Sequence, residues 1–254
     1  MSGRVGVVGV IAALSLVLFA GGAGSAAAAA AGCSLAGPFG AGRTQVWLLR
    51  PASTAKSVVL FAHGWTAVDP NDWHRTRFDH LCANGSIVLF PRYQRDELDT
   101  WPQSVDGFRR GVQAGFEELG STRLPVVVAG FSFGGALVNY YAGNARAWKV
   151  PVPRSVFSIF PTTRVPGRSV GTPPASVRFV ILAGDHDEVV GTAGAMDFMV
   201  WLKRHPPAKK TFRLVRSSAA LTASHEAPKE MTAASTRTFW KPIDVLVADA
   251  RRSG

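Results

Sequence analysis

Short apolar runs alternate with stretches of helical periodicity along most of this chain. A strand covered on both faces reads as a continuous apolar run. Such runs predict buried strands at residues 57–62, 87–90, 124–129, 155–160 and 177–182. Residues 44–49 alternate as an edge strand would, and the more polar residues 211–215 also indicate a place near an edge. The pattern predicts an α/β fold, a mostly parallel central sheet with helices on both faces.

Capping residues and apolar faces in the segments between these runs predict helices. Asp69 can cap a first helix that begins at Pro70 and ends before the turn at 84–85. An amphipathic helix ending near 119 has one apolar face, made of Val105, Phe108, Val112, Phe116 and Leu119. Further helices are expected at 134–145, 193–204 and 242–250. The Pro- and Gly-rich residues 161–174 predict a surface loop too short for a large lid.

The first 31 residues predict a secretory signal peptide. A single charge, Arg4, precedes an apolar segment over 5–20, and small residues follow as far as Ala31. The segment is shorter than the ~20 residues that span a bilayer. Cleavage would leave 32–254 as one secreted or extracytoplasmic domain. The chain has 28 basic and 17 acidic residues, and this segment holds only one charge, so the mature net charge is +10.

Cys33 and Cys82 are the only cysteines. In an exported protein such a pair suggests a disulfide, which would join the mature N-terminus to the first helix. Two alternatives remain open: lipid anchoring at Cys33, and two reduced, buried thiols. Two cysteines without clustered histidines argue against a structural zinc site.

The segment Gly130-Phe131-Ser132-Phe133-Gly134 lies between a predicted strand and a predicted helix. In that context G-x-S-x-G forms a sharp turn that raises the serine hydroxyl above the sheet. The helix N-terminus and the Phe133 N–H would then stabilise a developing oxyanion. Ser132 is therefore the candidate nucleophile.

A serine nucleophile needs a histidine base and an orienting acid, here in the chain order Ser, Asp, His. His225 follows the last predicted strand and is the candidate base. Asp187 is the favoured acid, because Asp185 lies nearer the strand end and is expected to hold the turn; Glu188 is a third option. His186 adjoins the acid too closely in sequence to serve as its base.

His63 closes the strand at 57–62, which places the Trp65 N–H as the second oxyanion donor. His63 itself is expected to shape that loop by hydrogen bonds. The remaining histidines, His74, His80 and His205, are expected to be surface residues or hydrogen-bonded core residues.

With these residues assembled, the chain resembles the α/β-hydrolase superfamily, in particular small bacterial esterases related to dienelactone hydrolases and cutinase-like polyester hydrolases. The resemblance runs from about 44 to 250 and rests on these motifs: His63-Gly64-Trp65, Pro91-Arg92-Tyr93-Gln94, 130–135, 184–191, Ser224-His225 and 239–242. It implies Ser132 as nucleophile, His225 as base, Asp187 as acid, Trp65 and Phe133 as oxyanion donors, and no metal or organic cofactor. Many dienelactone hydrolases use cysteine, so the serine here favours ordinary esters.

The resemblance implies an ester hydrolase but does not fix its substrate. Because the loop at 161–174 is too short for a large lid, we expect an open cleft for short-chain or polymeric esters, with Trp65, Phe133 and Tyr93 as candidate walls of an acyl pocket. The expected protein is a secreted monomer whose basic surface associates with the anionic cell envelope. Acyl transfer or thioester hydrolysis by the same triad remains open. So does a non-catalytic protein of the same fold that binds the anionic cell envelope. The basic residues between 203 and 216 come with no nucleic-acid recognition motif, so nucleic acid is not an expected partner.

Overall fold

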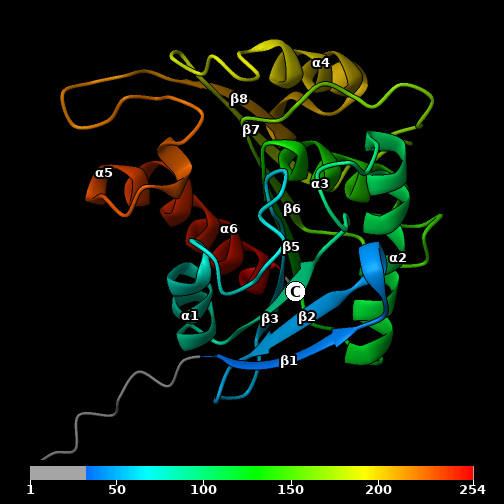
Figure 1. Cartoon of the computed structure of the whole chain (residues 1–254). Coiled ribbons are helices and arrows are strands. Elements are labelled where there is room, and N and C mark those ends of the chain that lie inside the picture. Colours follow the sequence, from blue (N-terminus) through cyan, green and yellow to red (C-terminus); the bar gives the residue numbers. More distant parts are fainter. Residues whose placement is uncertain (1–32, 254) are drawn as a thin grey trace, which may run out of the picture.

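An eight-stranded sheet forms the centre of the computed structural model, which describes residues 33–253 (Figure 1). The strand order is β1-β2-β4-β3-β5-β6-β7-β8. β2 runs antiparallel to both of its neighbours, and all other neighbours are parallel. The strands are β1 Ser34–Phe39, β2 Val46–Arg50, β3 Ser57–Ala62, β4 Ser86–Pro91, β5 Val126–Phe131, β6 Ser155–Ile159, β7 Arg178–Gly184 and β8 Lys210–Val215.

The five predicted buried strands are confirmed, with bounds within two residues. β8 is an edge strand, as its polar residues indicated. The edge position predicted for 44–49 is wrong, because β1 pairs with the outer side of β2. β1 was not predicted because Gly37 and Pro38 interrupt any strand pattern, and its pairing with β2 is irregular between Ala36 and Phe39.

Helices cover both faces of the sheet, as predicted. Figure 1 shows α1 and α6 on one face and α2 and α3 on the other. The helices are α1 Arg75–Ala83, α2 Trp101–Leu119, α3 Phe133–Asn144, α4 Ala193–Trp201, α5 Ala233–Ser235 and α6 Lys241–Arg252. A π-helical segment, Thr236–Trp240, leads into α6. Each face has its own apolar core: Val105 and Leu137 belong to one, and Phe78 and Ile243 to the other.

The first helix begins later than its sequence suggested. Asp69 does not cap a helix at Pro70; its carboxylate accepts the Asn71 N–H at 2.8 Å and forms a local turn. α1 therefore starts only at Arg75. The clearest predicted helix, α2, is capped by Thr100, whose hydroxyl accepts the Gln103 N–H while the Gln103 side chain accepts the Thr100 N–H.

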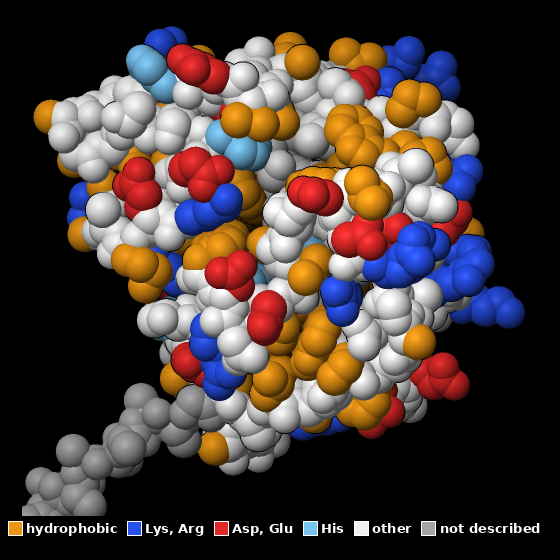
Figure 2. Space-filling view, viewed as in Figure 1, with side chains coloured by type: hydrophobic (Ala, Val, Ile, Leu, Met, Phe, Trp, Pro, Cys, Tyr) orange, Lys and Arg blue, Asp and Glu red, His pale blue; other side chains and the backbone are white. Residues whose placement is uncertain are grey.

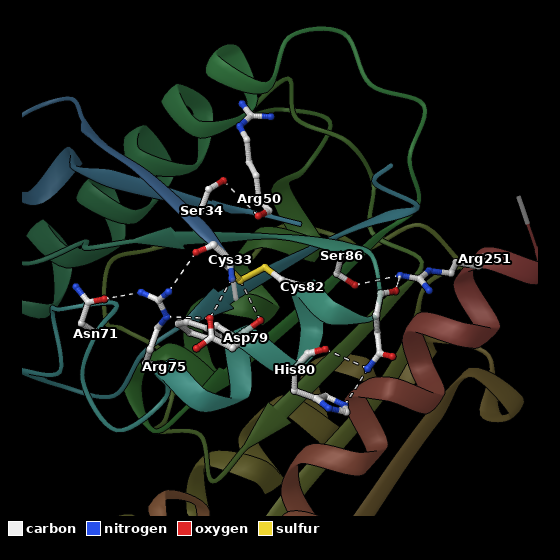
Figure 3. The surroundings of a disulfide bond; sticks show 12 residues. Cys33, Ser34, Arg50, Asn71, Arg75, Asp79, His80, Cys82, Ser86 and Arg251 are labelled. Atoms are coloured by element: carbon white, nitrogen blue, oxygen red, sulfur yellow. Dashed lines mark hydrogen bonds and ion pairs between the residues drawn. A yellow bond between two sulfur atoms is a disulfide. The ribbon is translucent and has the colours of Figure 1, made fainter. Parts of the chain in front are cut away.

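The predicted disulfide joins Cys33 to Cys82, with 5.5 Å between their Cα atoms (Figure 3). It ties the chain just before β1 to the end of α1. Arg75 strengthens this junction by donating to the Cys33 carbonyl and to Asp79. The bond uses the thiol that lipidation of Cys33 would need. The predicted signal peptide lies outside the described residues, within which no helix is both long and apolar enough to cross a membrane.

Candidate active site

Ser132 stands at the sharp turn between β5 and α3. Its φ of 58° is in the left-handed region, where a non-glycine residue is strained. The turn also brings backbone into close contact: a Cβ on Gly134 would lie 2.1 Å from the Ala62 oxygen, and one on Gly130 would lie 2.3 Å from the Gly134 oxygen. Glycine is therefore required on both sides of Ser132, for the reason that the motif suggested.

His225 connects the other two candidate residues. Its Nε2 lies 3.0 Å from Ser132 Oγ, and its Nδ1 lies 2.8 Å from Asp187 Oδ2. All three residues are buried, with 6–7% of their surface exposed. With the ring proton on Nδ1, His225 donates to Asp187, and Nε2 accepts from the serine hydroxyl. The structure thus brings together Ser132, Asp187 and His225, which are far apart in sequence.

The environment of Asp187 keeps its carboxylate ionised. Burial by itself would raise the pKa of Asp187, but hydrogen bonds from His225 and from the Val189 and Val190 N–H groups together lower it. Both carboxylate oxygens therefore have donors. One orients the imidazole, and the other fixes the loop that follows β7.

The alternative acid, Asp185, faces a different partner. Its carboxylate accepts the Ser217 N–H and, at 2.6 Å, the Ser217 hydroxyl. His186 Nδ1 lies 2.9 Å from the same carboxylate and from Ser217 Oγ. These contacts with His186 and Ser217 hold the pKa of Asp185 well below its usual range. The Ser217 hydroxyl also accepts the Ala223 N–H, so this exposed cluster joins the loop of Asp187 to the loop of His225.

Glu188, the third option, is exposed. Among the described residues its carboxylate forms no ion pair. It does not join the contact between Asp187 and His225.

The loop after β3 lies against the nucleophile. A Cβ on Gly64 would stand 2.9 Å from the Phe131 ring and 3.6 Å from Ser132 Cβ, so this loop passes directly beside the serine. Within residues 33–253, the N–H groups of Trp65 and Phe133 donate to no acceptor of the protein. Both predicted oxyanion donors therefore retain an unused N–H next to Ser132.

Buried polar side chains hold this loop in place. Both ring nitrogens of His63 lie 2.6 Å from carbonyl oxygens, those of Gly64 and Arg92. Tyr93 stacks on the His63 ring and donates to the His63 carbonyl at 2.8 Å. Tyr93 is fully buried, so its suggested place in an acyl pocket is wrong. It supports the loop from below, and the shaping role expected for His63 agrees with its contacts.

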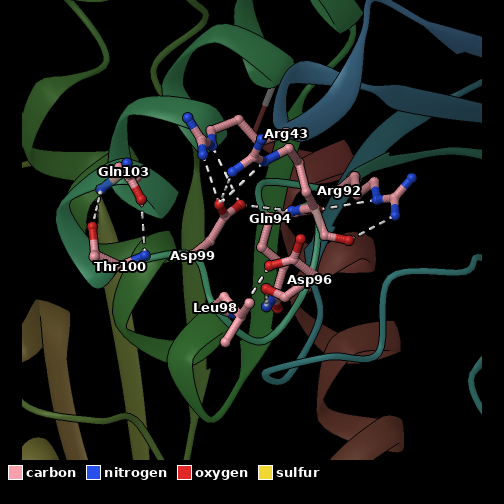
Figure 4. A network of polar contacts seen from close by, with 9 residues as sticks. Arg43, Arg92, Gln94, Asp96, Leu98, Asp99, Thr100 and Gln103 are labelled. Atoms are coloured by element: carbon pink, nitrogen blue, oxygen red, sulfur yellow. Dashed lines mark hydrogen bonds and ion pairs between the residues drawn. The ribbon is translucent and has the colours of Figure 1, made fainter.

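Gln94 and Asp99 extend this support, and sequence reasoning missed both roles. The buried Gln94 amide oxygen accepts the Thr66 N–H at 2.8 Å. Asp99, in turn, binds Arg43 at 2.6 Å and Arg95 at 3.0 Å (Figure 4). The hydrogen bond from Arg43 is the largest cause that holds the pKa of Asp99 well below its usual range, and the contacts with Arg95 add to it. The motif 91–94 was the available signal, but it did not show which loop these side chains would hold.

Aromatic rings lie beside the oxyanion loop. Trp65 is half-buried and meets Phe133 edge to face, with 5.2 Å between ring centroids. Phe133 is only 1% exposed and therefore belongs to the core more than to a pocket wall. Trp101, at the start of α2, lies 5.3 Å from the same ring and is 39% exposed. Trp65 and Trp101 thus offer the accessible apolar surface, and Trp101 was not predicted.

His74 differs from the sequence expectation. It precedes α1, is fully buried, and stacks on Trp73 with Phe61, Phe78 and Phe90 around it. Neither ring nitrogen has a hydrogen-bond partner in the described chain. Burial lowers the pKa of His74 to about 3 and that of His63 to about 4. His205 does follow expectation, since it is buried and contacts the Val177 carbonyl at 2.8 Å.

The arrangement suits nucleophilic attack by a serine on a carbonyl carbon. Among residues 33–253, no group of three or more His, Cys, Asp or Glu side chains is placed to hold a metal ion.

No protein-family model and no curated protein matches this sequence. Solved structures do match its fold. MGS-M1, an alpha/beta hydrolase enzyme from a Medee basin deep-sea metagenome library, is 13% identical, with a TM-score of 0.63 over 87% of this chain and 99% of that one. The thermophilic esterase Est2 of Thermogutta terrifontis is 12% identical, with a TM-score of 0.61 over 87% and 95%. Esterase B of Lactobacillus rhamnosis is 14% identical, with a TM-score of 0.61 over 82% of each chain.

These structures share their architecture with this chain while differing in most residues. The chain has the α/β-hydrolase fold.

Proposed function

We propose that this protein is a serine hydrolase that cleaves carboxylic esters through an acyl-enzyme intermediate. The observation that carries the proposal is the position of His225 between Ser132 Oγ and Asp187 Oδ2, at 3.0 and 2.8 Å. The esterase neighbours of the same fold support this choice of reaction.

His225 Nε2 removes the Ser132 proton as Oγ attacks the ester carbonyl. The tetrahedral oxyanion is stabilised by the Trp65 and Phe133 N–H groups and by the N-terminus of α3. Asp187 stabilises the imidazolium that forms, and the imidazolium then gives its proton to the departing alcohol. Water repeats these steps on the acyl-enzyme. The scheme uses no metal or organic cofactor.

Short-chain or polymeric esters are the proposed substrates. The loop at 161–174 contains no helix that could close over Ser132. The half-buried Trp65 and the exposed edge of Trp101 offer apolar surface beside the serine. A disulfide is typical of oxidising compartments, and it supports a secreted or extracytoplasmic location. No contact in the structure favours acyl transfer or thioester hydrolysis over ester hydrolysis.

Turnover of p-nitrophenyl acetate and butyrate tests the proposal. The wild-type protein should hydrolyse both, and Ser132→Ala should lose this activity while it keeps its thermal unfolding temperature. Activity that survives the substitution would overturn the assignment of the nucleophile. A strong preference for long-chain esters would contradict the open site.

A further inference from the structure

The segment from α4 to β8 has an unusual distribution of charge. Residues 198–225 contain six Lys or Arg and no Asp or Glu. Lys203 and Arg204 are exposed, and neither takes part in an ion pair within the described chain. The acidic residue of α4, Asp197, is already paired with Arg164 at 2.7 Å. The chain just after α4 therefore presents positive charge that no acidic side chain among residues 33–253 neutralises.

Two exposed apolar side chains lie on α4, just before these cations in the chain. Met196 and Val200 are 48% and 58% exposed, although large apolar residues are usually buried. The spacing of four residues places Met196 and Val200 on one face of α4, which ends at Trp201. The cations Lys203 and Arg204 follow directly in a 3-10 turn, Leu202–Arg204. Figure 2 shows Lys and Arg side chains beside hydrophobic ones in the region where Figure 1 draws α4.

A hollow of about 620 Å³ lies next to these cations. Its lining comes from two segments and includes Gly171 and Pro173 of the first, and Trp201, Lys203, Arg204 and Pro206 of the second. Trp201 donates its indole N–H to the Gly171 carbonyl at 2.9 Å, which fixes the half-buried ring at the wall. The hollow thus combines an aromatic wall with two cationic side chains, a composition that suits a phosphate-bearing headgroup.

We propose that Met196, Val200, Trp201, Lys203 and Arg204 form a docking surface for an anionic lipid bilayer. Apolar side chains enter the acyl boundary, the indole lies at headgroup level, and the cations bind lipid phosphates. A soluble polyanion would use the cations but would gain little from Met196 and Val200. Glu188, exposed in the loop before α4, would be repelled by anionic lipid, so the contact is centred on the C-terminal half of the helix.

Vesicle co-sedimentation tests the docking surface independently of catalysis. The full chain carrying Ser132→Ala, which cannot consume the lipid if the proposed function holds, is mixed with vesicles of pure phosphatidylcholine or of equal parts phosphatidylcholine and phosphatidylglycerol. We expect binding to the anionic vesicles only. Replacing both Lys203 and Arg204 by Gln should weaken it about 30-fold, at about 1 kcal/mol for each charge near the surface. Val200→Ser should weaken the binding that persists at high salt.

A matched control replaces Arg123 and Arg146, two exposed cations outside this surface, by Gln. This variant loses the same net charge and should bind as the parent does. Equal loss in both double variants would show attraction by net charge alone and overturn the proposal. Binding to neutral vesicles that Val200→Ser does not weaken would also overturn the proposal. A third contradicting result would be that soluble polygalacturonate binds as tightly as the anionic vesicles and loses as much affinity when Lys203 and Arg204 are replaced by Gln.

Discussion

Two regions flank Ser132, and they are built differently. The oxyanion side consists of the loops after β3 and β4 and is held by buried groups: His63, Tyr93 and Gln94 are all 0% exposed. The base side consists of the loops after β7 and β8, which are joined by the exposed Asp185 and His186 and the half-buried Ser217. Buried polar groups are costly to leave unpaired, whereas exposed ones can turn to water. Substitutions should therefore cost more on the oxyanion side, except in the triad itself.

The largest effect is expected from a substitution in the triad Ser132, Asp187 and His225. Asp187→Asn removes the charge that stabilises the imidazolium and favours the wrong tautomer of His225, so kcat should fall on the order of 10³- to 10⁴-fold. Steady-state hydrolysis of p-nitrophenyl butyrate measures it. Asp185→Asn is the matched control and should cost much less. A larger loss in Asp185→Asn would show that the acid is misassigned.

Acid should destabilise the protein through two buried histidines of the oxyanion side. Burial lowers the pKa of His63 and His74 to about 4 and about 3, whereas an unfolded histidine titrates near 6.5. Between these values the unfolded chain binds more protons, so the free energy of unfolding should fall by several kcal/mol as pH decreases from about 6.5 to about 4.

Urea unfolding over this pH range measures the effect. His74→Phe fills the same aromatic cluster without the unpaired ring nitrogens, and it should reduce the pH dependence without loss of stability at pH 7. An unchanged pH dependence in this variant would show that His74 does not contribute to acid sensitivity.

Gln94→Leu tests the support of the oxyanion loop. It leaves the Thr66 N–H without its buried acceptor, a cost of about 1–3 kcal/mol. We expect kcat to fall roughly tenfold with little change in KM, because the loop positions donors for the transition state rather than the substrate. Gln103→Ala, which removes half of the capping box of α2, is the control and should alter stability alone. Equal kcat in Gln94→Leu and wild type would contradict the supporting role.

The smallest effect is expected from Ser217→Ala. The hydroxyl links Asp185 to the Ala223 N–H, but the cluster is open to solvent, so kcat/KM should fall only a few-fold, for a loss of about 1 kcal/mol. Ser217→Thr should restore the rate, and Ser218→Ala should leave it unchanged. A loss greater than that of Gln94→Leu would reverse the proposed difference between the two sides.

Local signals in the sequence predicted most of the fold and the candidate triad. Continuous apolar runs placed β3 to β7, and the glycines beside Ser132 placed the serine turn. Asp187 was separable from Asp185 because the residue nearer the strand end was expected to hold the turn.

Features that depend on distant contacts were not predictable. β1 exists because β2 and a disulfide hold it, not because of its own sequence, which contains Gly37 and Pro38. The roles of Tyr93 and Gln94 depend on a loop about 30 residues earlier. The ring nitrogens of His74 lack hydrogen-bond partners because aromatic side chains surround the ring. The pattern of apolar residues along the chain does not reveal such packing.

Covalent capture tests the central claim most directly. A p-nitrophenyl phosphonate should release one equivalent of p-nitrophenol per chain, abolish ester hydrolysis, and leave a single adduct on the peptide that contains Ser132. Ser217 also lies beside a histidine and an aspartate. Its hydroxyl donates a hydrogen bond to the Asp185 carboxylate and not to the histidine, so Ser217 should remain unlabelled. An adduct on Ser217, or ester hydrolysis that continues after Ser132 is labelled, would contradict the account.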